Sequence, residues 1–252
     1  MSRVLGFLYG IVGYIFSLAV FVYLIAFLGN LTELFGYQLP VPRTIDGPGA
    51  NSGIEPFVVN LLLLALFGLQ HTVMARHGFK EKLRAVIGRK MERPTYLVMT
   101  NIFLVVLYYF WMPVPAVVWT LEGWGAIVMN IGYWFGWAVI LISTFLIDHF
   151  ELFGLKHAIY QLRERDMPRY EFVTPFFYKL VRHPLYLGWL MVFWCAPVMT
   201  QGHIFMSFVW TLYIFVAINY EERDLAAAFG KKYTEYMKSV PMIFPFLKMG
   251  KK

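Results

Sequence analysis

The sequence predicts an all-α integral membrane protein, a bundle of about six transmembrane helices. Of its 252 residues, 59% are hydrophobic and only 15% are charged, whereas a soluble domain is usually about 45–50% apolar and about 25% charged. The apolar residues form six long runs, and nearly all lysines and arginines lie in three of the segments outside those runs. An aromatic content of 19% excludes a disordered chain.

Each apolar run predicts one helix, because about 20 apolar residues cross a hydrocarbon core of about 30 Å. The first run is too long for a signal peptide and lacks a small-residue cleavage site, so we expect it to be retained. Only Gln201-Gly202 separates the last two runs, which predicts a tight hairpin. Its first arm is short and contains Pro197, so this arm is expected to tilt, kink or stop short of a full crossing. The six runs are residues 4–28, 56–75, 95–112, 124–147, 184–200 and 203–220.

The positions of the 22 lysines and arginines predict the orientation of the helices. Segments 76–93, 148–182 and 221–252 hold all of them except Arg3 and Arg43. Six crossings place these three segments on one side, and the positive-inside rule makes that side cytoplasmic. We therefore expect both termini to be cytoplasmic. The net charge of +7 then reflects topology and attraction to anionic lipid, which argues against a nucleic-acid partner.

No linker, internal repeat or low-complexity segment divides the chain, so residues 1–252 are predicted to form a single transmembrane domain. Cys195 is the only cysteine, which excludes an internal disulfide framework and a multi-cysteine metal site. The sequence lacks the patterns G-x-x-x-x-G-K-[ST] and G-x-G-x-x-G, which bind phosphates. We expect no metal site, with one alternative left open: a haem held by two of His71, His149 and His183. The oligomeric state leaves no signal in the sequence.

A dense group of polar residues stands at the start of the fifth run. Pro184 suits a first helical turn, and the free N–H groups there, together with Arg182, favour an anionic ligand group. The two arms of the hairpin are similar in length, so Glu221 and Glu222 return to the membrane level of Arg182 and His183. This pattern suits a zwitterionic ligand. The alternative is a plain interfacial salt bridge of Arg182 with one of the glutamates.

Three more polar residues interrupt the apolar pattern near the same membrane face. His71 lies near the end of the second run, and Asp148 and His149 follow the fourth run. An ionisable residue in a membrane span is costly and often functional, which favours a functional role for His71. An acid beside a histidine can orient or deprotonate a substrate, so we predict catalytic roles for His149 and Asp148 as well as His71. The structural alternatives are a histidine bonded to a neighbouring carbonyl and an aspartate that pairs with loop cations.

Three motifs follow one another in the last third of the chain: Arg182-His183-Pro184-x-Tyr186-x-Gly188, Glu221-Glu222-x-x-Leu225 and Gly230-x-x-Tyr233-x-x-Tyr236. In this order they resemble the S-adenosylmethionine-binding half of integral membrane methyltransferases. This superfamily includes the isoprenylcysteine carboxyl methyltransferases and the phospholipid N-methyltransferases. The resemblance implies a cofactor-binding hairpin and C-terminal segment at residues 182–245 that holds S-adenosylmethionine.

The same resemblance implies a role for each motif residue. Arg182 and His183 lie near the cofactor carboxylate, Tyr186 lines the pocket, and Glu221 or Glu222 lies near the ribose or the amino group. Pro184 and Gly188 complete the implied cofactor-binding set.

Three motifs in earlier parts of the chain narrow the resemblance: residues 67–76, Glu92-Arg93-x-Thr95-Tyr96 and residues 148–155. They resemble the nurim-like branch, and within it the bacterial methanethiol S-methyltransferases. That family implies a bacterial inner-membrane enzyme with its active site facing the cytoplasm. It also implies a small volatile thiol as substrate, namely methanethiol, which gives dimethyl sulfide, with hydrogen sulfide as a poorer substrate.

The implied reaction is an in-line displacement in which a thiolate attacks the sulfonium methyl group, so alignment supplies much of the rate. His149 or His71 would act as general base, with Asp148 orienting an imidazole. Three alternatives remain at this stage: methylation of another membrane-partitioned thiol, carboxylate or amine, a haem protein, and a non-catalytic nurim-like protein.

Overall fold

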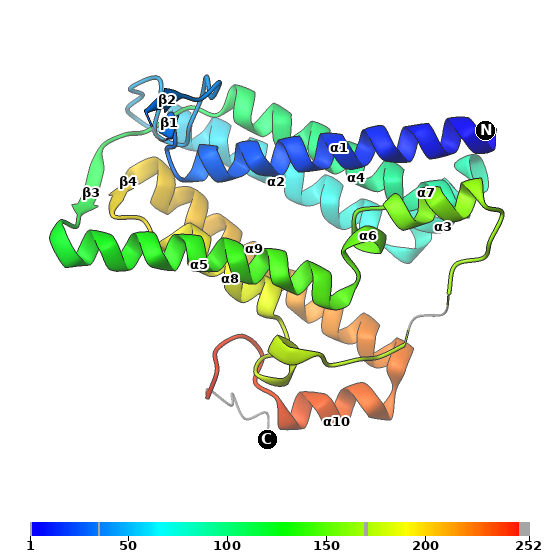
Figure 1. Ribbon diagram of the computed structural model, residues 1–252. Helices are drawn as coiled ribbons and strands as arrows, with labels where there is room; N and C mark the ends of the chain where they lie inside the picture. The colour runs from blue at the N-terminus through cyan, green and yellow to red at the C-terminus, as the bar shows by residue number, and fades with distance from the viewer. Residues whose placement is uncertain (1, 35, 169–170, 247–252) are drawn as a thin grey trace. The chain divides into compact units, whose positions relative to one another are not determined.

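The computed structural model describes residues 2–34, 36–168 and 171–246, which fold mainly into α-helices (Figure 1). The helices are α1 Arg3–Leu28, α2 Glu55–Ala75, α3 His77–Ile87, α4 Arg89–Phe110, α5 Gly123–Ile147, α6 His149–Leu152, α7 Leu155–Leu162, α8 Pro184–Trp194, α9 Gln201–Phe229 and α10 Lys231–Ser239. The remaining elements are the 3-10 helix η1 Phe176–Lys179 and the strands β1 Glu33–Leu34, β2 Tyr37–Gln38, β3 Val117–Thr120 and β4 Val198–Thr200.

The chain forms two compact units, and each is assembled from separate stretches of the sequence. The first unit contains residues 1–120, 149–167 and 198–206. The second contains residues 121–148, 168–197 and 207–252. α9 begins in the first unit and continues in the second, so this one long helix contributes residues to both units.

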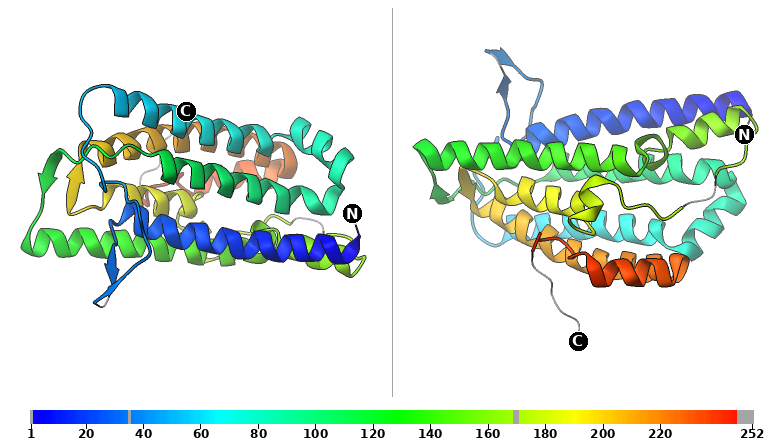
Figure 2. Two further views of the ribbon diagram at one scale, coloured as in Figure 1. Left: turned by 90° about the horizontal axis from the view of Figure 1, so that it is seen from above. Right: turned by 60° about the horizontal axis from the view of Figure 1, so that its bottom comes forward.

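In the first unit, α1 packs against α4 and α7, and α2 packs against α3 and α4 (Figure 2). A Cβ atom on Gly10 of α1 would lie 2.2 Å from the Cβ atom of Ala158 in α7, so a residue without a side chain is needed at this crossing. The buried Asn101 amide donates to Ser17 Oγ at 2.6 Å and links α4 to α1. A hydrogen bond of this kind satisfies polar groups that would be costly to bury alone.

In the second unit, α5 and α8 pack closely because glycines face each other across the contact. A Cβ atom on Gly188 would lie 2.8 Å from the Gly136 carbonyl oxygen and 2.7 Å from Ile140 Cγ1. Cys195 also packs here, since a Cβ atom on Gly132 would lie 2.7 Å from its sulfur. Small residues at a helix crossing let the backbones approach, as is common in membrane proteins.

All six predicted apolar runs contain helices, but not all of these helices have the length of the predicted run. Within the described residues, α1, α2, α5 and α9 are long and apolar enough to cross a membrane. α4 begins at Arg89, six residues before the predicted run, so its first turns carry charge. α8 has 11 residues, which is about 16 Å of helix at about 1.5 Å per residue and too short for a hydrocarbon core of about 30 Å.

The fifth run stops short because its last residues form a strand and not a helix. α8 ends at Trp194, Pro197 follows, and β4 pairs with β3 in antiparallel register. β1 and β2 form a second antiparallel pair. These two strand pairs are additions to the predicted all-α fold.

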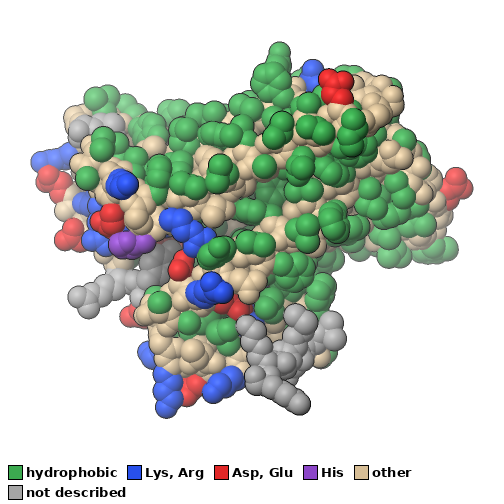
Figure 3. Space-filling view, turned by 180° about the vertical axis from the view of Figure 1, so that it is seen from behind, with side chains coloured by type: hydrophobic (Ala, Val, Ile, Leu, Met, Phe, Trp, Pro, Cys, Tyr) green, Lys and Arg blue, Asp and Glu red, His purple; other side chains and the backbone are tan. Residues whose placement is uncertain are grey.

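The long helices expose many large apolar side chains. Val22 of α1, Leu62 of α2 and Ile131 of α5 are each more than 60% exposed. Figure 3 shows one face of the molecule, on which hydrophobic side chains cover wide areas and charged side chains gather in separate patches. Such extensive apolar exposure is unfavourable in water and suits lipid. The chain is therefore an integral membrane protein.

Candidate active site

The second unit builds a buried polar cluster at the start of α8. His183 is the N-cap residue of α8, and Pro184 begins the helix, as the sequence predicts. The backbone N–H groups of Arg182 and His183 donate to the carbonyl oxygens of Pro241 and Met242, at 2.9 and 3.0 Å. The segment that leads into α8 is therefore held by the C-terminal segment of the chain.

The Arg182 side chain links three parts of the second unit. Its Nε donates to Glu222 Oε1 of α9 at 2.7 Å. Its Nη1 donates to the carbonyl oxygens of Met237 and Val240, at 3.0 and 2.6 Å. The side chain is only 9% exposed. This guanidinium therefore fixes the end of α10 and the residue after it to α9.

Glu222 also contacts His183, so one carboxylate has two side-chain partners. The distance from Glu222 Oε1 to His183 Nε2 is 3.1 Å, and both side chains are buried. Glu221 Oε2 lies 3.9 Å from His183 Nδ1, and the Glu221 side chain is 45% exposed. The Tyr186 ring packs 5.6 Å from the His183 ring. The predicted cationic and acidic groups thus meet, and the Arg182–Glu222 pair is buried and not a solvated surface bridge.

Gly188 lies about one turn after Pro184 in α8 and contacts α5. The space that its side chain would fill is occupied by Ile140 and the Gly136 backbone of α5. Its observed role is close packing of α5 and α8.

Tyr233 of α10 lies near the charges of Glu222, Glu221 and Arg182, and the predicted site set omits it. It is 2% exposed, and its hydroxyl has no hydrogen-bond partner within the described residues. Burial raises the pKa of this phenol, and the nearby Glu222 and Glu221 carboxylates raise it further. The hydroxyl therefore stays protonated and can donate to a ligand. The spacing Gly230-x-x-Tyr233 is the sequence signal that could have identified it.

Tyr236 occupies the next turn of α10 and has a structural contact. Its hydroxyl donates to the Tyr178 carbonyl oxygen at 2.5 Å. Burial raises the pKa of Tyr236 to about 12, although the Arg182 charge opposes this effect. Tyr236 is a neutral donor that joins α10 to the segment before α8.

In the first unit, the predicted base His71 lies in α2 and faces α4. Its ring nitrogens lie 2.9 and 3.0 Å from the Tyr96 hydroxyl, and Nδ1 lies 3.4 Å from Thr100 Oγ1. The Phe67 ring stacks on the imidazole with a centroid distance of 5.5 Å. Within the part of the chain that the structure describes, the hydrogen-bond partners of His71 are thus side chains of α4 and include no neighbouring carbonyl.

The second predicted base, His149, begins α6 and is 5% exposed. Its Nε2 lies 3.0 Å from the Tyr14 hydroxyl of α1, and its ring packs 4.7 Å from the Phe153 ring. Asp148 is the C-cap residue of α5 and belongs to the second unit. Sequence reasoning did not pair the two histidines with Tyr14 and Tyr96, because these partners lie on other helices, 135 residues from His149 and 25 residues from His71.

Known proteins resemble this chain over most of its length. The phospholipid methyltransferase family model matches residues 125–232. A methanethiol S-methyltransferase of Crocosphaera subtropica is 39% identical and covers 100% of this chain and 95% of its own length. A methanethiol S-methyltransferase of Pseudomonas deceptionensis is 45% identical over 82% of this chain and 80% of its own length. The chain belongs to the methanethiol S-methyltransferase family.

Family membership confirms the resemblance read from the motifs. Nurim of Xenopus laevis is 27% identical over 67% of this chain and 62% of its own length, which agrees with the nurim-like branch. No solved structure matches the chain. As a member of this family the chain is a methyltransferase and needs a methyl donor.

The residue range matched by the methyltransferase family model contains most of the buried polar cluster. Residues 125–232 include α8, both glutamates and Arg182, and they end one residue before Tyr233. Within the described residues, no group of three or more histidine, cysteine, aspartate or glutamate side chains is arranged to hold a metal ion. The candidate site is therefore the Arg182–His183–Glu222 cluster with Tyr186, Glu221 and Tyr233.

Proposed function

We propose that this protein transfers a methyl group from S-adenosylmethionine to methanethiol and releases dimethyl sulfide. The observation that supports this most directly is a sequence identity of 39% and 45% to two named methanethiol S-methyltransferases over most of the chain. The buried cluster supplies the polar groups that a charged methyl donor needs, inside the range that matches the methyltransferase family.

The cluster residues fit S-adenosylmethionine by charge and by hydrogen-bonding capacity. S-adenosylmethionine carries an ammonium group, a carboxylate, ribose hydroxyls and a sulfonium. The buried Tyr233 hydroxyl has no hydrogen-bond partner among the described residues and is suited to the ribose hydroxyls. The partly exposed Glu221 carboxylate is suited to the ammonium group. His183 and the N–H groups at the start of α8 are suited to the carboxylate.

The proposed cofactor-binding set is Arg182, His183, Pro184, Tyr186, Gly188, Glu221 and Glu222, within the hairpin and C-terminal segment 182–245. Arg182 acts in this set by fixing Glu222 and the chain around Val240, because its contacts are with those groups. Gly188 acts by allowing α8 to approach α5. Both are positioning roles that hold the other members in place.

The bound cofactor supplies an electrophilic methyl group on a sulfonium. The protein's own part would be to hold a thiolate in line with that methyl group, which the thiolate would take from the sulfonium with release of the demethylated thioether. His149 or His71 accepts the thiol proton, and Asp148 helps to orient an imidazole. Tyr14 and Tyr96 fix the planes of the two imidazole rings through their hydroxyl contacts.

We propose a single transmembrane domain over residues 1–252, a bundle of about six membrane helices with both termini cytoplasmic, located in the bacterial inner membrane. Four long apolar helices support the spanning core. α8 is too short for a full crossing, so its proposed place is the cytoplasmic half of the bilayer, with Arg182 at the interface. The active site would then face the cytoplasm.

A headspace measurement tests this function. Purified protein receives methanethiol and S-adenosylmethionine, and dimethyl sulfide is quantified by gas chromatography. We expect dimethyl sulfide from the wild type and a large loss of turnover in His149→Ala, with a smaller change in cofactor affinity. No dimethyl sulfide, together with methylation of lipid amines or prenylcysteine, would show that the proposed substrate is wrong.

A further inference from the structure

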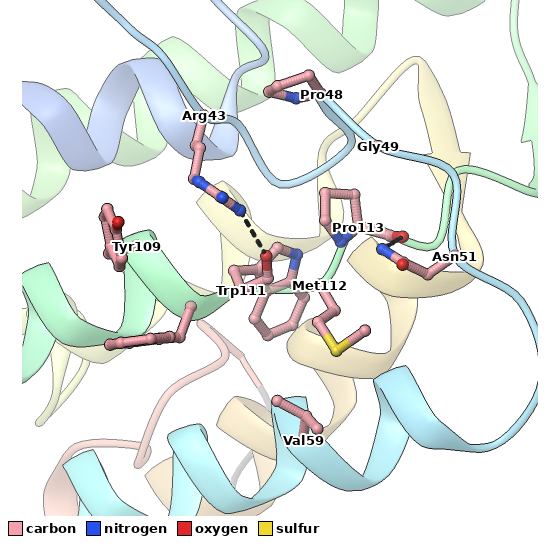
Figure 4. A pocket seen from close by; sticks show the side chains of 10 residues that line it. Arg43, Pro48, Gly49, Asn51, Val59, Tyr109, Trp111, Met112 and Pro113 are labelled. Carbon is pink, nitrogen blue, oxygen red and sulfur yellow. Dashed lines mark hydrogen bonds between the residues drawn. The ribbon is translucent and has the colours of Figure 1, made fainter.

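We propose that the first unit binds the head group of an anionic phospholipid in a pocket built around Arg43. The pocket has a volume of about 510 Å³, and none of its lining residues is among those proposed for methyl transfer. Figure 4 shows the Arg43 side chain directed toward the Trp111 carbonyl oxygen, with Tyr109 beside it. The other lining residues are Pro48, Gly49, Asn51, Val59, Phe110, Met112 and Pro113.

The pocket lies where the chain leaves and re-enters the membrane. α1 ends at Leu28 and α2 begins at Glu55, and both helices are long and apolar enough to span. Arg43 belongs to the connection between them, and Tyr109 lies at the end of α4. The ends of spanning helices mark the interface with lipid head groups, where aromatic and cationic side chains are favourable.

The charge at this pocket is suited to a phosphate. The guanidinium of Arg43 lies 5.5 Å from the centre of the Tyr109 ring, and its Nη1 donates to the Trp111 carbonyl oxygen at 3.4 Å. Among the described residues, no carboxylate forms an ion pair with Arg43. The nearby Asp46 carboxylate instead accepts hydrogen bonds from Asn30 and Thr200. Arg43 therefore keeps planar donors for a bidentate contact with an anionic group such as a phosphate diester.

The walls of the pocket are suited to the apolar part of a lipid. Tyr109 is 64% exposed and Phe110 is 55% exposed. Val59 and Met112 add aliphatic surface beside them. A soluble anion would leave this surface in contact with water, whereas a phospholipid covers it with its glycerol and upper acyl chain. The combination of one cation and an apolar wall favours a lipid over a free phosphate.

Hydrogen bonds hold the pocket in shape. The Asn51 side chain and its backbone N–H both donate to the Pro113 carbonyl oxygen, at 2.9 and 3.1 Å. The Asn60 side chain bonds both the N–H and the carbonyl oxygen of Met112, at 2.9 and 2.8 Å. The Trp111 indole donates to the Ile45 carbonyl oxygen at 2.9 Å. A site formed before binding loses less conformational entropy when its ligand arrives.

Native mass spectrometry of the whole protein in detergent tests the proposal with dioleoyl phosphatidylglycerol and dioleoyl phosphatidylcholine as probes. The wild type is expected to bind phosphatidylglycerol more tightly than phosphatidylcholine. Arg43→Gln is expected to weaken the phosphatidylglycerol complex about tenfold, because a charge-assisted contact is lost. Arg89→Gln is the matched control, since Arg89 is an exposed arginine at the opposite end of α4, and it should leave binding unchanged.

A second variant and a second ligand complete the test. Tyr109→Leu removes the exposed ring beside the guanidinium and should weaken the same complex even if Arg43→Gln does not fold. Glycerol phosphate tests a free phosphate source and is expected to bind far more weakly than the lipid. Equal binding of the two lipids by the wild type, equal binding of glycerol phosphate, or full binding by a folded Arg43→Gln or Tyr109→Leu variant would overturn the proposal.

Discussion

Replacing Glu222 with glutamine removes the negative charge on which the buried cluster depends. The carboxylate accepts from Arg182 Nε at 2.7 Å and lies 3.1 Å from His183 Nε2, and the side chain is 8% exposed. Glutamine has nearly the same shape, so Glu222→Gln leaves packing intact and leaves the Arg182 guanidinium without its counter-charge. The perturbation is therefore electrostatic.

The expected cost follows from the burial of the pair. Removing one partner of a buried ion pair destabilises a protein by about 3–5 kcal/mol, because the other charge stays buried and uncompensated. The glutamine oxygen still accepts one hydrogen bond, which places the expected loss near the lower end, at about 3 kcal/mol. For a chain of this size that corresponds to a fall of roughly 6–12 °C in the unfolding midpoint.

The assay is thermal unfolding of the purified protein in one detergent, followed by circular dichroism. Glu221→Gln is the matched control, because this neighbouring carboxylate is 45% exposed and 3.9 Å from His183. An exposed pair contributes about 0–1 kcal/mol, so the control should unfold within about 4 °C of the wild type. Equal midpoints for Glu222→Gln and Glu221→Gln would refute the reasoning that a buried ion pair holds the cluster together.

Two further predictions separate packing from ligand binding. Gly188→Ala should destabilise the protein by about 1–3 kcal/mol in the same unfolding assay, because its Cβ would lie 2.7 Å from Ile140. Gly125→Ala is the control in α5, where the nearest atom lies at 3.4 Å, and similar midpoints for the two variants would contradict the packing role. Tyr233→Phe should leave the midpoint unchanged and weaken S-adenosylmethionine binding roughly 2- to 13-fold in calorimetry, since the lost hydroxyl has no partner among the described residues. Lower stability with unchanged affinity would show that this hydroxyl serves the fold.

The helices of this protein could be predicted where one long apolar run determines the structure. α1, α2 and α5 begin and end within one residue of the predicted runs, because membrane thickness dictates their length. The end of α8 could not be placed in the same way. Residues 198–200 are apolar enough for a helix, but they pair with residues 117–120, and nothing local to either segment reveals that pairing.

The candidate site, too, could be predicted only in part. The return of the hairpin predicts that Arg182 meets the glutamates, and the structure has Arg182 bound to Glu222. The position of Tyr233 depends on a sharp turn between α9 and α10, where Gly230 adopts φ +56°. A glycine tolerates this backbone conformation, but the sequence does not state the direction in which the chain then turns. The contacts of Arg182 with Met237 and Val240 follow from that turn and were beyond prediction.

The dependence of Arg182 on the end of the chain also sets an order of events during synthesis. Chains emerge from the ribosome N-terminus first at about 5–20 residues per second, so α8 is complete before the carbonyl groups of Val240 and Pro241 exist. Until then Glu222 is the only one of these partners that the guanidinium can have. The backbone N–H groups of Arg182 and His183 also lack their partners, the carbonyl oxygens of Pro241 and Met242. The Arg182–His183–Glu222 cluster is thus completed only after residues 237–242 have been synthesised and have folded back onto the segment before α8.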